Sequence, residues 1–120
     1  MMGMGYTWST PIRFVVAPSL YVKVEDYSPK QPVAGEEVTF RVRVGLAREF
    51  NYDTRVEAVM AVGGSAKTAC REDNIVDRKQ GVIWAGSSNG TMFEFKLKIT
   101  KTVYVCFGAK VISYHPPVGR

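Results

Sequence analysis

Hydrophobic and polar residues alternate with period two along most of this chain, a pattern typical of β-strands that bury one face. The clearest runs are residues 37–44 (EVTFRVRV) and 92–99 (MFEFKLKI). Residues 55–62 alternate more weakly, whereas residues 103–111 are apolar on both faces, as expected of a central strand. These runs predict about seven strands when three shorter candidates are added: residues 12–16, 20–24 and 82–85.

Turn-forming residues separate the runs, and no segment of eleven or more residues has helical periodicity. Asn89 and Gly90 stand just before the run 92–99 and predict a tight turn, because both tolerate positive φ. Residues 66–81 are the most polar part of the chain, and we expect a long loop there with at most one short strand or turn. The pattern predicts an all-β fold, a single antiparallel β-sandwich.

The chain has 120 residues, a length that suits one domain with one hydrophobic core. We expect the sandwich domain to span residues 1–120, with an N-terminal arm at 1–18 and an extended tail at 115–120. The predicted core is the set of inward-facing positions together with one tryptophan: Val38, Phe40, Val42, Val44, Val56, Ala58, Met60, Phe93, Phe95, Leu97, Tyr104, Cys106 and Trp84.

Two segments resemble immunoglobulin-like and fibronectin type III-like modules. Residues 28–44 (SPKQPVAGEEVTFRVRV) have the Pro-rich lead-in and Gly-Glu turn that precede strand B. Residues 102–106 (TVYVC) resemble strand F, with a tyrosine corner at Tyr104. The strand-B cysteine and strand-C tryptophan of antibody domains are missing. The chain is more similar to disulfide-poor modules of prokaryotic and archaeal surface proteins, filaments and virions, which implies an immunoglobulin-like sandwich with an adhesive or structural function.

This strand assignment leaves little chain for a strand G after residues 103–111. An unpaired edge beside strand F would accept a strand from elsewhere. The N-terminus carries a surplus strand that could be donated to its own domain or to a neighbouring copy: Ile12, Arg13, Phe14, Val15 and Val16. The alternative is a short strand G or a different strand count.

The two cysteines, Cys70 and Cys106, allow a disulfide that ties the polar loop to strand F, with two buried free thiols as the alternative. A catalytic cysteine needs a nearby base, and the single histidine, His115, lies in the Pro-rich tail. One histidine excludes metal sites that need two. We therefore expect no cofactor and no enzymatic activity.

The composition is basic, with 16 Lys+Arg against 11 Asp+Glu and a net charge of +5. Arg41, Arg43, Lys96 and Lys98 would share one sheet face, and a basic face with aromatic residues can bind nucleic acid. The aromatic residues of these strands fall on the apolar faces instead, so an ordinary solvated face is the preferred interpretation. A small basic β-barrel that binds single-stranded nucleic acid is the alternative function.

Asn89-Gly90-Thr91 matches the N-glycosylation sequon, although a turn alone also explains it. No apolar stretch is long enough for a secretory signal or a membrane helix. The resemblance favours an extracellular surface or a virion as the location. We expect a non-catalytic structural or interaction module that assembles with protein partners, including copies of itself, through strand edges.

Overall fold

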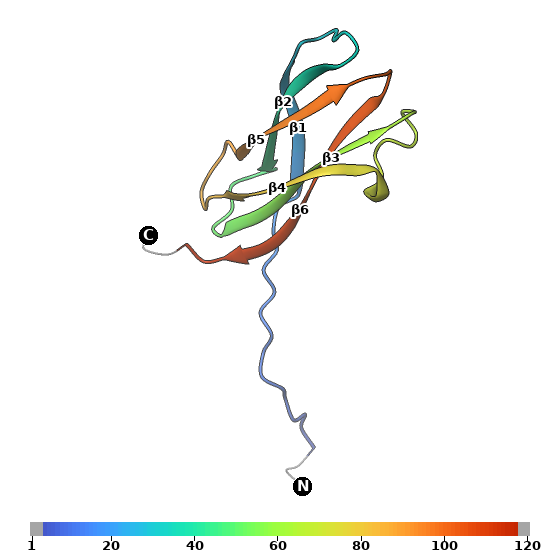
Figure 1. Ribbon diagram of the computed structural model, residues 1–120. Coiled ribbons are helices and arrows are strands. Elements are labelled where there is room, and N and C mark those ends of the chain that lie inside the picture. Colours follow the sequence, from blue (N-terminus) through green and yellow to red (C-terminus); the bar gives the residue numbers. More distant parts are fainter. Residues whose placement is uncertain (1–3, 118–120) are drawn as a thin grey trace.

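A computed structural model of the chain describes residues 4–117 as two antiparallel sheets packed face to face. One sheet has the strand order β1-β2-β5 and the other β4-β3-β6 (Figure 1). The predicted antiparallel β-sandwich is confirmed, with six strands in the described part of the chain where about seven were expected. In chain order the elements are β1 (Leu20–Ser28), β2 (Glu36–Leu46), β3 (Asp53–Gly63), the 3-10 helix η1 (Glu72–Asn74), β4 (Ile75–Ile83), β5 (Thr91–Ile99) and β6 (Tyr104–His115).

The core lies between β2 and β5 on one side and β3 on the other. The alternation of the sequence sets Phe40 opposite Phe95 and Val42 opposite Phe93, with all four side chains buried. β3 contributes the buried Met60 and its inward-facing neighbours from the second sheet. β2 and β5 are the strands with the clearest predicted period, because a strand buried on one face must keep that face apolar.

β4 occupies a segment that we expected to be loop. It runs from Ile75 to Ile83, so the predicted loop 66–81 is loop only in its first half. Of the strand expected at 82–85, residues 82–83 are the end of β4 and residues 84–85 lie in the connection that follows. The strand contains three consecutive charged residues, Asp77, Arg78 and Lys79, which interrupt the alternation of polar and apolar positions. Such charges are tolerated because β4 is an edge strand, exposed or half-buried at every position before Ile83.

β6, expected to be a central strand, lies at the edge of its sheet, and β3 is the central strand. The residues of β6 that pack toward the core are Val105, Phe107, Ala109 and Val111. Tyr104 has the opposite parity and is 49% exposed, so the core position and tyrosine corner predicted for it are wrong. Because β6 is apolar on both faces, period two could not decide which face turns inward.

Two more core predictions change with this assignment. Cys106 shares the parity of Tyr104 and is half-buried on the outer side of β6. Trp84 follows β4 in the connection to β5 and is exposed. Leu97 is half-buried but packs against the core, and the other nine predicted core residues are buried.

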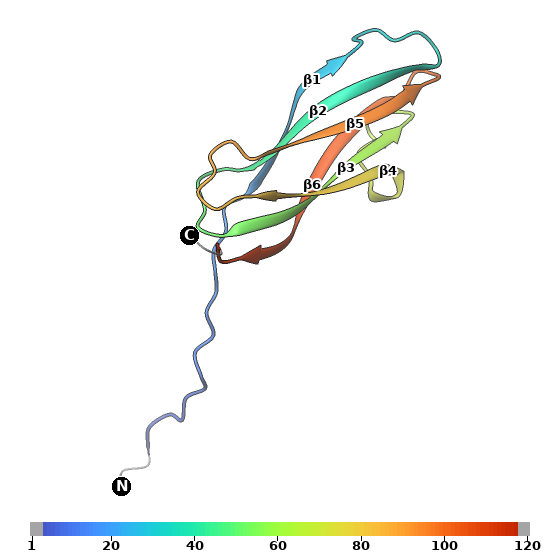
Figure 2. The same ribbon diagram turned by 60° about the vertical axis from the view of Figure 1, so that its left-hand side comes forward.

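The N-terminal arm, here defined as residues 4–19, extends away from the sandwich (Figures 1 and 2). Every residue from 4 to 16 is exposed, and the strand expected at 12–16 belongs to neither sheet. The radius of gyration is 20.4 Å, against about 14 Å for a compact chain of this length. The arm is therefore an extended appendage, not part of the packed domain.

The strand register defines two ends of the sandwich. At the arm end, Leu20 begins β1 opposite Leu46, and His115 closes β6 opposite Asp53. Both the arm and the C-terminal end of β6 are therefore at this end, as Figure 2 shows. His115 belongs to β6 and not to the predicted tail 115–120, of which residues 118–120 lie outside the described part.

Candidate interaction site

β6 is a long apolar strand with one free side. It has twelve residues and pairs with β3, and no second strand among the described residues pairs with its other side. None of its twelve residues is buried, although the strand is apolar on both faces. Its outer row of backbone N–H and C=O groups is a template for another strand. The sequence prediction of an unpaired edge at this strand agrees with this arrangement.

The other three edge strands are protected by charge. β1 carries Lys23, Glu25 and Asp26 and has a bulge before Asp26. β4 and β5 each carry three charged residues as well. β6 has one lysine, Lys110, along its whole length, apart from the terminal histidine. Charges and bulges keep edges from pairing, so β6 is the edge left open to association.

A groove of about 560 Å³ opens beside the start of β6, at the end of the sandwich opposite the arm. We call this the groove end. Its walls come from the β1–β2 connection, from β2 and from the β5–β6 connection, and β6 enters it at Val105. The apolar lining includes Tyr27, Pro29, Pro32, Phe40 and Val103. Aliphatic and aromatic walls with few charges suit an apolar side chain.

Aromatic packing fixes the floor and the rim of the groove. Phe107 from β6 packs on Phe40 and Phe95, with ring centroids 5.1 and 5.5 Å apart. Tyr27 stacks on Phe40 at 5.8 Å, and the Lys30 ammonium lies 3.9 Å from the Tyr27 ring centroid. The contacts of Phe107 cross between the two sheets and set their spacing beside the groove, whereas Tyr27 and Lys30 shape its rim.

A disulfide joins Cys70 to Cys106, with Cα atoms 5.3 Å apart. Cys106 belongs to β6, and Cys70 lies in the loop before η1. The pairing considered from the sequence is therefore present, and it ties the first half of the polar segment to the open strand. The bond anchors β6 on its outer face, where no core packing holds it.

The four basic residues predicted to share a face do so, on the outer side of β2 and β5. Acidic residues stand between them, however: Arg41 faces Glu94, and Lys98 faces Glu37. The surface is therefore mixed in charge and is not a basic patch, and Lys96 faces the neutral Thr39. This mixture explains why a net positive chain has no continuous basic face on this sheet.

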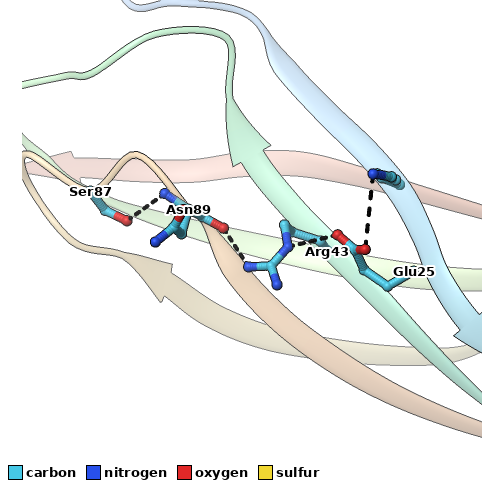
Figure 3. Close-up of polar contacts among 5 residues, drawn as sticks. Glu25, Arg43, Ser87 and Asn89 are labelled. Carbon is cyan, nitrogen blue, oxygen red and sulfur yellow. Dashed lines mark hydrogen bonds and ion pairs between the residues drawn. The ribbon is translucent and has the colours of Figure 1, made fainter.

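Arg43 is held in a polar chain across the same sheet (Figure 3). Its Nε donates to Glu25 Oε1 at 2.8 Å, and its Nη1 donates to the backbone oxygen of Asn89 at 2.6 Å. Lys23 lies 4.0 Å from the other oxygen of Glu25. The hydrogen bond from Arg43, with a smaller contribution from Lys23, holds the pKa of Glu25 below its ordinary value.

Asn89 is exposed at the end of the β4–β5 connection, where a glycosyl group could reach it. The tight turn expected here does not join two paired strands, because β4 and β5 belong to different sheets. Gly90 has a φ of 67°, and an added Cβ would lie 2.3 Å from the Val44 carbonyl oxygen. Asn89 does not adopt positive φ. Glycine is thus needed at position 90 for the close approach to β2, and glycosylation of Asn89 stays a prediction.

The alternation along the arm extends beyond residues 12–16. The predicted donor segment covers residues 12–16, but period two continues back to Tyr6 and Trp8. The polar Thr10 interrupts the apolar series, so the pattern alone predicted a strand only at residues 12–16. The groove residues of the β1–β2 connection could not be found in this way, because only the fold brings them beside β6.

Other kinds of site have little support in the described residues. No cluster of three or more His, Cys, Asp or Glu side chains that could hold a metal ion occurs among residues 4–117. No helix in that part of the chain has the length and apolar character needed to cross a membrane. Comparisons with known protein families, with curated proteins and with solved structures find no match to this chain.

Proposed function

We propose that this chain is a non-catalytic structural module of a cell surface, filament or virion that assembles with copies of itself by accepting a strand at β6. The observation that carries the proposal is the twelve-residue apolar edge without one buried residue. The resemblance to immunoglobulin-like modules supports it, because there a further strand, G, pairs beside strand F. An added strand would cover the apolar side chains and complete the hydrogen bonding of β6.

Nucleic-acid binding is less well supported. Arg43 is engaged by Glu25 and Asn89, and Arg41 and Lys98 face carboxylates across the strands. Phosphate binding needs several free cations on one surface. Affinity for single-stranded DNA that persists at about 0.15 M salt, where surface charges are strongly screened, would contradict the proposed function.

The test compares the mass of the full chain by light scattering over a wide range of concentration with that of two variants. Val103→Asp puts a charge into the groove beside β6. Val76→Asp, the matched control, puts the same charge on the exposed opposite edge of the same sheet. We expect the full chain and Val76→Asp to associate and Val103→Asp to stay monomeric. A full chain that stays monomeric throughout, or unchanged association in folded Val103→Asp, contradicts the proposal.

A further inference from the structure

We propose that the strand accepted at β6 is the N-terminal arm of a second copy of this chain, running antiparallel to β6. This inference rests on the proposed function and names the segment that the open edge accepts. It rests on three properties of the arm: the pattern of its side chains, its length and the end of the sandwich from which it leaves.

The first property is an unsatisfied apolar face. The five apolar side chains of this face are between 76% and 86% exposed in the isolated chain, an unusual exposure for residues of this kind. The opposite parity is mostly polar, with Thr7, Ser9 and Arg13, and also holds Pro11 and the less exposed Val15. A strand that buries one face needs this alternation. The full inward series is Tyr6, Trp8, Thr10, Ile12, Phe14 and Val16.

The second property is length. At about 3.3 Å per residue, the segment from Tyr6 to Val16 spans about 36 Å in extended form. β6 has twelve residues and spans about 40 Å by the same rise. Pro11 lacks an N–H group and is tolerated in a strand only where that side has no partner. The arm therefore suits a strand that covers one edge over its whole length.

The third property is direction. β6 runs from the groove end to the arm end, so a strand antiparallel to it finishes at the groove end. The body of the donor then lies beyond the groove end of the acceptor, and the acceptor's own arm leaves at the other end. Both ends remain usable, so successive copies can join head to tail.

Self-insertion requires a different arrangement. The arm of the same chain would have to reverse at residues 17–19 and run parallel to β6, whereas every strand pair in the two sheets is antiparallel. Pro18 is buried and Ala17 packs against the core, which holds the exit of the arm in its outward direction. The antiparallel direction also brings Phe14 and Val16 to the groove end.

The test uses full-length variants. Phe14→Asp disables the donor, and Val15→Asp is its matched control on the opposite parity of the same arm. We expect Phe14→Asp to weaken association by roughly 100-fold and Val15→Asp by less than about threefold. Of these two residues, only Phe14 is on the face of the arm that becomes buried against the acceptor. A mixture of Phe14→Asp with Val103→Asp leaves one intact arm and one intact groove, so it should form a heterodimer and no larger species. Since Phe14 is exposed in the isolated chain, its substitution leaves the fold intact.

Introduced cysteines test the direction. Chains carrying Val16→Cys, mixed with chains carrying Val103→Cys, should cross-link into covalent dimers, because Val16 is the arm residue that reaches the start of β6. A cross-link within one chain carrying both Tyr6→Cys and Val103→Cys would show self-insertion and overturn the inference. If Phe14→Asp associates like the full chain while Val103→Asp is monomeric, the arm is not the occupant and the proposed function stands. If both associate like the full chain, both proposals fail.

Discussion

Removal of the Cys70–Cys106 disulfide tests how much this cross-link stabilises the fold by restricting the unfolded chain. The two cysteines are 36 residues apart. Closing a loop of that size lowers the entropy of the unfolded chain by about 13 cal/mol/K, which corresponds to about 4 kcal/mol at 25 °C. Cys70→Ser combined with Cys106→Ser should therefore lower the free energy of unfolding by about 4 kcal/mol. Cys106 is half-buried on the outer side of β6, so the change opens no core cavity that would add to this value.

The assay is urea unfolding, followed by far-ultraviolet circular dichroism at a protein concentration where the chain is monomeric. Reduction of the unmodified protein should reproduce the loss, and the same reductant should leave the doubly substituted protein unchanged. A loss below about 1 kcal/mol would refute the reasoning, because the unfolded chain would then gain little freedom when the bond is absent.

Two further predictions concern the outer side of β2. Gly90→Ala should destabilise the fold by about 3 kcal/mol in thermal or urea unfolding, because the added Cβ would lie 2.3 Å from the Val44 carbonyl oxygen and the alanine would have to adopt positive φ. The control Gly86→Ala has positive φ but open space around the Cβ, so it should cost about 1 kcal/mol. Equal losses in the two variants would contradict the steric argument. Arg43→Met should raise the pKa of Glu25 toward its ordinary value of 4.5, as read from carboxyl chemical shifts during titration. Because the pKa of Glu25 is lowered in the folded state, its pairing with Arg43 stabilises the protein fully above the unfolded-state pKa. This stabilisation is lost as the pH falls through the folded-state pKa. An unchanged pKa of Glu25 in the variant would contradict the assigned cause.

The sequence was most informative where one face of a strand is buried. β2 and β5 were located within one or two residues, because alternation between Val or Phe and charged residues has only one explanation. The all-β sandwich follows from these strands and from the absence of helical periodicity. The same criterion missed β4, whose consecutive charged residues reflect an edge exposed to water.

β6 shows where the pattern becomes ambiguous. A strand that is apolar on both faces fits a central strand, but it also fits an edge that waits for a partner. The sequence could not show whether Tyr104 or Phe107 faces the core, since both are aromatic and they lie on opposite faces of the strand. The order of the strands, β4-β3-β6, shows that β6 is an edge strand. The groove could not be predicted at all, because its walls are distant in the sequence and meet only in the folded chain.

The direction of β6 relative to the arm has a mechanical consequence. In the assembly proposed above, each joint is a strand lying along the long axis of the chain of subunits. The hydrogen bonds between that strand and β6 are perpendicular to the strands. Tension along the axis would therefore load all of these bonds together in shear, and they would have to break at once and not one after another. A module of 120 residues could in this way form a joint that resists pulling without any covalent link between subunits.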